Sequence, residues 1–241
     1  MRQVSICGLR VHDVTMAEAV LACLALVERG GPAAVYTPNA EMAKRAMDDA
    51  AFMALLNRGD LVVPDGAGVL LAARMLRRPL REKVAGVELA AALLPAFAQR
   101  GTRLFLFGGR PGIAERAAQA LRQAHPGLVI CGVADGYFSE EAERVEAIRG
   151  AGAQAVYVCL GVPKQERFID QNRGAIPALM LGLGGTLDLF AGEARRAPDF
   201  WIRHNLEWLY RGGLDPRRWS RLMQIPAFLW AVQRDARGRR A

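Results

Sequence analysis

The sequence predicts an α/β protein in which helices cover a Rossmann-like, mostly parallel sheet of about six strands. Two observations predict this fold. Short apolar runs of strand length recur between residues 33 and 182, and segments with apolar residues at helical spacing alternate with them. Such alternation is typical of βαβ units. In addition, glycines or acidic residues follow most of the apolar runs, which predicts that polar turns gather at one edge of the sheet.

An N-terminal hairpin precedes this sheet. Residues 4–7 and 9–14 are short apolar runs on either side of Gly8, a pattern typical of two strands joined by a tight turn. Thr15 is then in position to cap a helix that we expect to end near Arg29.

The remaining elements follow from the same alternation. We expect sheet strands near residues 33–37, 61–63, 103–107, 128–133, 155–160 and 178–181. We expect helices over residues 40–47, 49–57, 67–76, 87–99, 113–124 and 139–149, and a further helix that opens near residue 163. Residues 1–197 are assigned to one α/β domain and residues 198–241 to a helical C-terminal appendage.

Asp65 follows an apolar strand directly, in the turn Pro64-Asp65-Gly66. Ligands of open parallel sheets bind beyond the carboxyl ends of the strands, so this carboxylate stands where chemistry is usually placed. An Asp before a helix is equally typical of an N-cap. A second strand end with polar residues, Thr37 and Asn39, favours a shared site with Asp65.

Three further strand ends carry glycines or polar residues. Gly108 and Gly109 lead into a helix. The glycines of such a turn either let the backbone bind a diphosphate or only allow the tight strand-to-helix connection. Asp135 follows the next strand, where it either meets a ribose hydroxyl or shapes the turn. Gln165, Glu166 and Asp188 follow the last two strands, and together these turns imply one large site.

The formal charge of +8 is concentrated at the C-terminus, where residues 198–241 hold nine arginines against four acidic residues. A basic block of this kind suits nucleic acid, an anionic membrane surface or a diphosphate. It distinguishes none of the three.

Several classes of protein are disfavoured by what the sequence lacks. Cys7, Cys23, Cys131 and Cys159 show no metal-ligand spacing and are interpreted as reduced core residues. The sequence has neither Asp-x-Asp nor clustered histidines, so no metal site is expected. It has no membrane-length apolar run and no secretory signal, and we expect a cytoplasmic protein.

Seven short motifs, taken in order and spacing, resemble the WecG/TagA/CpsF family of bacterial glycosyltransferases over essentially the whole chain. They are Thr37-Pro38-Asn39-Ala40-Glu41, Pro64-Asp65-Gly66-x-Gly68-Val69, Gly108-Gly109-x-Pro111-Gly112, Gly161-x-Pro163-Lys164-Gln165-Glu166, Gly184-Gly185-Thr186-x-Asp188-x-x-Ala191-Gly192, Arg196-Ala197-Pro198 and Leu206-Glu207-Trp208-Leu209-Tyr210-Arg211. The fold of this family, a Rossmann-like domain with a helical appendage, agrees with the pattern of elements.

The resemblance implies a UDP-sugar-dependent hexosyltransferase. Such an enzyme moves a hexose or N-acetylhexosamine, such as N-acetylmannosamine or glucose, from a UDP-sugar to a polyprenyl-diphosphate-linked saccharide in cell-surface polysaccharide biosynthesis. The reaction would proceed with inversion, without a metal or other cofactor. The enzyme would be peripherally associated with the inner face of the cell membrane, with no nucleic acid as a partner.

The resemblance also assigns roles. Asp65 matches the proposed general base, while Thr37 and Asn39 match polar residues that position substrate. Where the family commonly has arginine, this chain has Lys83, which keeps the charge and loses two-pronged phosphate binding. The other expected substrate-binding residues are Gly108, Gly109, Asp135, Gln165, Glu166, Asp188, Arg211, Arg218 and Arg221.

The tail contains a mostly apolar stripe flanked by arginines, which we expect to form a helix kinked or broken by Pro226. The stripe comprises Trp219, Leu222, Met223, Pro226, Leu229, Trp230 and Gln233. It either packs on the core or on another copy of the chain, or lies on an anionic membrane.

Two rival functions stay open at this point. A NAD-type dinucleotide-binding oxidoreductase fits the alternation of elements and the turn at Gly108, although the full G-x-G-x-x-G fingerprint is absent. A nucleic-acid-binding module fits the basic tail, but none of the usual nucleic-acid-binding motifs accompanies it.

Overall fold

The computed structural model describes residues 1–194, 198, 201 and 224–238. Its first element is the predicted hairpin, in which β1 (Gln3–Ile6) pairs antiparallel with β2 (Leu9–His12). The two residues between the strands, Cys7 and Gly8, both have positive φ angles, of 49° and 96°. Positive φ at both central positions is the geometry of the tight turn that suits the twist of a two-stranded hairpin.

The main sheet is six-stranded and entirely parallel, with the strand order β4-β3-β8-β7-β5-β6. Its strands are β3 (Ala33–Tyr36), β4 (Leu61–Val62), β5 (Leu104–Gly108), β6 (Ile130–Ala134), β7 (Ala155–Cys159) and β8 (Leu179–Gly182). The predicted fold class, a parallel α/β sheet with an N-terminal hairpin and a C-terminal helix, is confirmed.

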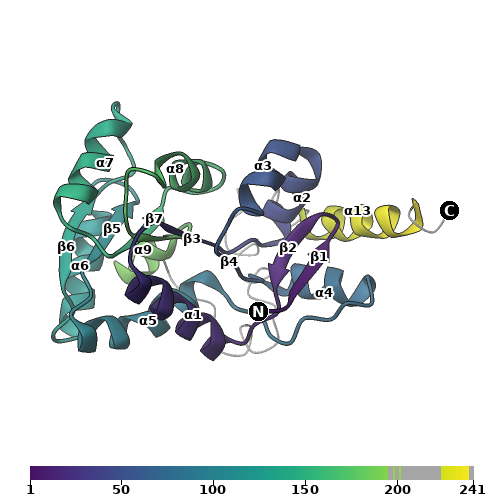
Figure 1. Ribbon diagram of the computed structural model, residues 1–241, viewed down its shortest axis with the longest axis horizontal. Helices are drawn as coiled ribbons and strands as arrows, with labels where there is room; N and C mark the ends of the chain where they lie inside the picture. Colours follow the sequence, from purple (N-terminus) through teal and green to yellow (C-terminus); the bar gives the residue numbers. More distant parts are fainter. Residues whose placement is uncertain (195–197, 199–200, 202–223, 239–241) are drawn as a thin grey trace.

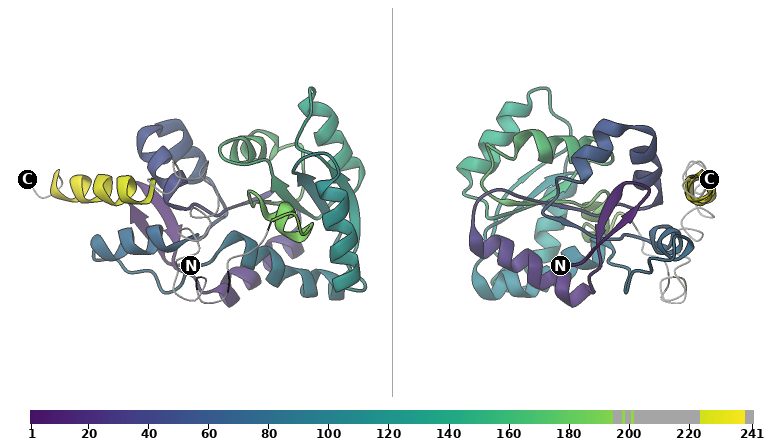
Figure 2. Two further views of the ribbon diagram at one scale, coloured as in Figure 1. Left: turned by 180° about the vertical axis from the view of Figure 1, so that it is seen from behind. Right: turned by 45° about the vertical axis from the view of Figure 1, so that its right-hand side comes forward.

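Helices cover both faces of the sheet (Figures 1 and 2). They are α1 (Met16–Arg29), α2 (Ala40–Asp48), α3 (Ala50–Leu56), α4 (Ala67–Met75), α5 (Gly86–Arg100), α6 (Ile113–Ala124), α7 (Glu141–Gly150), α8 (Lys164–Asn172), α9 (Thr186–Phe190) and α13 (Gln224–Gly238). The alternating side chains of β3 show the two faces. Ala34 and Tyr36 join a core with the hairpin, α2, α3, α8 and α13, whereas Ala33 and Val35 join a core with α1, α5, α6 and α9.

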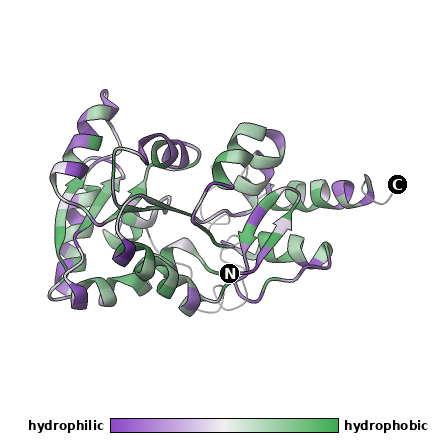
Figure 3. Ribbon diagram, in the orientation of Figure 1, coloured by the Kyte–Doolittle hydropathy of each residue, from purple (hydrophilic) through white to green (hydrophobic). Residues whose placement is uncertain are grey.

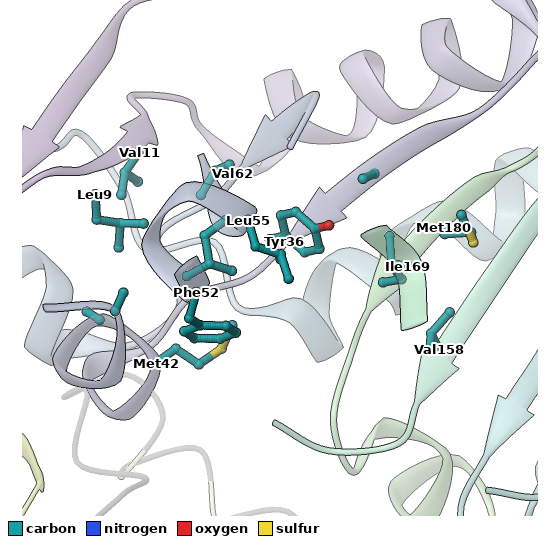
Figure 4. Close-up of a cluster of buried hydrophobic side chains, with 14 of the residues drawn as sticks. Leu9, Val11, Tyr36, Met42, Phe52, Leu55, Val62, Val158, Ile169 and Met180 are labelled. Carbon is teal, nitrogen blue, oxygen red and sulfur yellow. The ribbon is translucent and has the colours of Figure 1, made fainter. Parts of the chain in front are cut away.

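The hydropathy of the chain explains this layering. Figure 3 shows hydrophobic strands between helices of mixed character, as expected for strands buried on both faces. Figure 4 shows part of the first core, where Leu9 and Val11 of the hairpin and Val62 of β4 gather with side chains from α2 and α3. All four cysteines are free thiols, and Cys23 and Cys159 are buried, as the sequence predicts.

Helix α13 packs on α2 and α4 through Phe228 and Val232, both fully buried. Of the predicted apolar stripe, Leu229 packs partly on the core, whereas Pro226 is exposed and Trp230 is 64% exposed, so the predicted membrane contact stays a prediction. Pro226 lies near the start of a continuous helix and does not break it in its middle, since the first turn of a helix tolerates proline. The stripe positions Trp219, Leu222 and Met223 lie outside the described residues.

Because the sheet is parallel, all six strands end at one edge, where their order sets the order of the predicted turns. Along this edge the turns run from Asp65 after β4, through Thr37 after β3 and Gly184 after β8, to Gly108 at the end of β5 and Asp135 after β6. The edge is thus the candidate functional site.

Candidate functional site

Asp65 joins three segments at the β4 end of this edge. Its backbone N–H donates to the carbonyl of Pro38, 3.1 Å away, which links it to the turn after β3. Its carboxylate Oδ2 accepts from the backbone N–H of Gly86, the first residue of α5, at 3.2 Å. The N-cap of the helix that follows Asp65 is Gly66, with no side-chain cap, so Asp65 does not cap α4.

Thr37 lies beside the same contact. It is 6% exposed, and its hydroxyl donates to the carbonyl of Gly182 at the end of β8, 3.0 Å away. Gly86 packs directly on Thr37, because a Cβ added to Gly86 would lie 2.9 Å from the threonine Oγ1. Gly86 therefore contacts both the Asp65 carboxylate and Thr37, and a larger residue has no room there.

Asn39 and Lys83 flank this group, and both have partners within the chain. The Oδ1 of Asn39 accepts from the backbone N–H of Met42 at 3.0 Å and so caps α2. The Nζ of Lys83 lies 3.6 Å from Oε1 of Glu88, and both side chains are largely buried. The substrate-positioning roles predicted for Asn39 and Lys83 stay predictions beside these structural contacts.

Gln165 and Glu166 begin α8 behind the end of β8. Gln165 is 2% exposed, and its amide has two partners: Oε1 accepts from the backbone N–H of Gly184 at 2.9 Å, and Nε2 donates to Oε1 of Glu166 at 2.7 Å. Glu166 is 0% exposed, and burial raises the pKa of its carboxyl group to about 7. Both side chains are thus buried in the protein interior, next to the carboxyl end of β8, and are hydrogen-bonded to each other.

The β5 and β6 ends are built differently, from backbone contacts between glycine turns. Gly108 pairs with Cys159 of β7, and a Cβ at Gly108 would lie 2.2 Å from the Cys159 carbonyl oxygen. Gly109 has a φ of 74°, and its carbonyl accepts from the N–H of Gly136 at 2.9 Å. The glycines are therefore required by geometry, whether or not a diphosphate binds here.

Asp135 shapes its own turn. Its Oδ1 accepts from the backbone N–H of Tyr137 at 2.7 Å, and its Oδ2 lies 3.7 Å from a guanidinium nitrogen of Arg144. β6 lies five strand spacings from β4, roughly 24 Å at about 4.8 Å per spacing. The predicted single large site therefore contains two separate clusters, one around Asp65 and one around Gly109 and Asp135.

Asp188 lies in the first turn of α9, and its backbone carbonyl accepts from the N–H groups of Glu193 and Ala194 at 3.0 and 3.1 Å. The predicted ligands Arg211, Arg218 and Arg221 lie outside the described residues. Among the residues that the structure describes, no group of three or more His, Cys, Asp or Glu side chains is arranged to hold a metal ion. In the same part of the chain, no helix is long and apolar enough to cross a bilayer.

A cavity of about 720 Å³ lies at the N-terminus and the start of α1, lined by Arg2, Asp13, Glu18, Leu21, Ala22, Arg81 and Met1. Its charged side chains are paired: the Arg81 guanidinium lies 2.5 Å from Oε2 of Glu18, and the Arg81 N–H donates to Asp13 Oδ1 at 2.9 Å. These contacts fix the loop that leads to Lys83. No local sequence pattern indicates them, because they join residues 63 to 68 positions apart.

Sequence reasoning also missed Gly86, Gly182 and Gly184, which bind the functional side chains through backbone groups or close packing. Their signal is present as glycines next to predicted site residues. Backbone contacts of this kind depend on the paths of segments distant in sequence, and no motif spacing shows them.

Comparisons with known proteins identify the family of the chain. The model of the "Glycosyl transferase WecG/TagA/CpsF family" matches residues 4–241. A Bacillus spizizenii protein named N-acetylglucosaminyldiphosphoundecaprenol N-acetyl-beta-D-mannosaminyltransferase is 35% identical over 204 residues, which cover 84% of this chain and 79% of the relative. Proteins with the same name from Bacillus subtilis and Staphylococcus aureus are 33% and 32% identical, over 86% and 84% of this chain and 82% and 80% of theirs.

These relatives favour a sugar transferase over the rival oxidoreductase. The match spans both the sheet edge around Asp65 and the basic tail. The chain belongs to the WecG/TagA/CpsF family of glycosyl transferases.

Proposed function

We propose that this protein transfers N-acetylmannosamine, or a closely related hexose, from a UDP-sugar to a saccharide on polyprenyl diphosphate. The acceptor follows from the relatives, whose name specifies an N-acetylglucosaminyl diphosphoundecaprenol substrate and an N-acetylmannosaminyl group. The reaction inverts the anomeric centre and uses no bound metal.

The observation that carries this proposal is the position of Asp65. Its carboxylate stands at the carboxyl end of β4 and contacts the first amide of α5, and Thr37 is fixed beside that amide. A carboxylate that does not cap its own helix, at the edge where parallel sheets bind ligands, is suited to general-base catalysis.

In the proposed reaction, Asp65 accepts the proton from the attacking hydroxyl of the acceptor sugar. The hydroxyl oxygen forms a bond to the anomeric carbon from the face opposite the diphosphate. The bond from that carbon to the diphosphate oxygen breaks, and its electron pair leaves with UDP. Attack from the opposite face inverts the configuration, and the proton ends on Asp65.

The leaving UDP would extend from the anomeric centre beside Asp65 along the sheet edge toward the other cluster. Gly108 and Gly109 allow the backbone to approach the far part of the nucleotide closely, and Gly112 brings no capping side chain to the start of α6. Helix-start amides, Lys83 and arginines can offset the charge of the departing diphosphate. Asp135 is proposed to contact the nucleoside, and Asp188 and the arginines at 211, 218 and 221 are proposed further contacts.

The test is a screen of UDP-sugars with a lipid-diphosphate N-acetylglucosamine acceptor. The full-length protein is expected to extend the acceptor by one sugar with UDP-N-acetylmannosamine or a related donor, and to release UDP in a one-to-one ratio. Activity is expected to survive excess EDTA. Failure of every UDP-sugar with this acceptor would reject the proposed reaction, and loss of activity in EDTA restored by Mg²⁺ would reject metal independence.

A further inference from the structure

The Glu166 carboxyl group is buried in an arrangement that a charged carboxylate does not favour. One oxygen, Oε1, accepts from Gln165 Nε2 at 2.7 Å, and the other, Oε2, has no hydrogen-bond partner among the described residues. A buried polar atom without a partner calls for a specific explanation. A neutral acid loses far less on burial than an unpaired anion, so the neutral form suits this position.

Glu166 connects through Gln165 to the strand ends of the candidate site. Gln165 Oε1 accepts from the N–H of Gly184, and both side chains lie against Gly182, where an added Cβ would be 3.2 Å from Gln165 Nε2 and 3.5 Å from Glu166 Oε1. The carbonyl of the same Gly182 accepts from the hydroxyl of Thr37. One network therefore joins Glu166 to Gly184 and to Thr37.

We propose that Glu166 is a positioning residue that works as the neutral acid and, through Gln165, holds the Gly182–Gly184 strand end against Thr37. Its link to catalysis rests on the proposed function of the Asp65 cluster. The sequence suggested direct substrate contacts for Gln165 and Glu166. We propose a positioning role for Glu166 instead, because the Gln165 amide next to it already has two partners inside the protein.

The surroundings of Glu166 determine how it responds to pH. Burial raises its pKa to about 7, while the hydrogen bond from Gln165, a backbone hydrogen bond and, least of all, the positive charge of Arg45 on α2 act in the opposite direction. From β3, Tyr36 is close to it, and burial raises the pKa of that hydroxyl too. The other charged groups near Tyr36 are paired: Arg58 with Asp170 at 2.6 Å, and Arg173 with Asp60 at 2.5 Å.

Ionisation of Glu166 would place a new negative charge in this interior. The hydrogen bond from Gln165 to Oε1 favours the charged form, but the charge on Oε2 has no donor among the described residues. The ionised carboxylate therefore favours local openings that bring Oε2 to solvent and separate Glu166 from Gln165. Gln165 then loses its acceptor, and its hold on the N–H of Gly184 weakens. The strand end beside Thr37 is therefore expected to loosen as pH rises through about 7.

The experiment compares full-length wild type, Glu166→Gln, Glu166→Leu and the control Glu143→Gln, an exposed charge change on α7. Two quantities are measured at pH 6 and pH 9: hydrogen-exchange protection of the segment 183–188, relative to intrinsic rates, and kcat/KM for sugar transfer. In wild type and in the control, this protection is expected to fall at least about tenfold from pH 6 to pH 9.

Glu166→Gln keeps the acceptor and cannot ionise, so its protection should not depend on pH, and its kcat/KM relative to wild type should rise with pH. Glu166→Leu should show low protection at both pH values. Equal pH dependence in wild type and Glu166→Gln would overturn the inference. Exchange needs no substrate, so a failed transfer assay with the expected exchange pattern would count against the proposed function alone.

Discussion

The two halves of the sheet edge are built from different chemical groups. In the β4-β3-β8 half, side chains make the contacts: the half-buried Asp65 carboxylate, the buried Thr37 hydroxyl and the buried Gln165–Glu166 pair. In the β5-β6 half, glycine backbone groups make them, as Gly108 abuts Cys159 and Gly109 accepts from Gly136. The first half presents titratable groups and the second a closely approachable backbone.

This difference indicates a division of labour. Proton transfer needs a positioned titratable group, which only a side chain supplies. Recognition of a diphosphate needs close backbone approach, which glycines permit. We therefore expect the β4-β3-β8 half to act on the acceptor and the anomeric centre, and the β5-β6 half to bind the nucleotide.

The largest expected effect is on turnover, from Asp65→Asn. The variant keeps the shape of the side chain but cannot accept the proton, so kcat should fall by about 10³-fold. UDP affinity, measured by calorimetry, should change little because the nucleotide binds at the other half. An unchanged kcat in a variant of lowered stability would show that Asp65 is structural.

The second prediction concerns the close-packed glycine turn at the end of β5. Gly108→Ala places a Cβ 2.2 Å from a carbonyl oxygen at a φ of 128°, and overlap and backbone strain should together lower the free energy of unfolding by about 4 kcal/mol. Gly161→Ala is the matched control, because its φ is 77° with no neighbouring atom within 4 Å. Its expected cost is only about 1–2 kcal/mol. Denaturant unfolding measures both, and equal costs would contradict a close-packed turn.

The third prediction concerns stability and the Glu166 side chain. The pKa of Glu166 is raised from 4.5 to about 7 on folding, so the native state holds this proton more tightly than the unfolded state. Its contribution to stability is full below about pH 4.5 and is lost as pH rises through about 7, a change of about 3 kcal/mol. The difference in unfolding free energy between Glu166→Gln and wild type should therefore grow in favour of the variant from pH 5 to pH 8. A difference independent of pH would contradict the buried neutral acid.

The sequence predicted the fold almost completely, because local patterns determine its elements. The capping box of Thr15 and Glu18 starts α1 where expected, and the parallel orientation of the strands follows from the alternation of strands and helices. The observed element boundaries differ from the predicted ones where tertiary packing determines them. Strand β6 begins at Ile130 instead of residue 128, next to a shift in its register with β5. The core-facing side of α13 was not predicted, because Phe228, the side chain that α2 and α4 bury, is absent from the expected stripe.

The site was predictable only as a set of positions. That Asp65, Thr37 and Asp135 share one edge follows from the parallel sheet, but their grouping depends on strand order, which no local pattern specifies. The N-cap interpretation of Asp65 shows the same limit. Its carboxylate contacts the start of a helix, as a cap does, but that helix is α5 and not the adjacent α4.

The C-terminal helix lies against one of the two halves of the sheet edge. Helix α13 packs on α2 and α4, and these two helices follow the turns that contain Asn39 and Asp65. The described part of the appendage thus contacts the half expected to act on the lipid-linked acceptor. Deletion of the tail would expose the apolar surface that Phe228 and Val232 cover, so point variants on the outer face of α13 are a cleaner test than truncation.

The smallest expected effect is on membrane binding, from Arg234→Ala. The Arg234 guanidinium lies 5.8 Å from the centre of the Trp230 ring, and Trp230 is 64% exposed. If this pair lies on an anionic bilayer, loss of one arginine should weaken binding to anionic liposomes by about fivefold, or about 1 kcal/mol. Arg122→Ala on α6, in the other half of the molecule, is the control and should leave liposome binding unchanged.

High salt should reduce the difference between wild type and Arg234→Ala, whereas Trp230→Ala should weaken binding at any salt, because its contribution is apolar. Equal sedimentation of wild type and both α13 variants would show that this helix face does not meet the membrane. The acceptor would then have to reach Asp65 without help from α13.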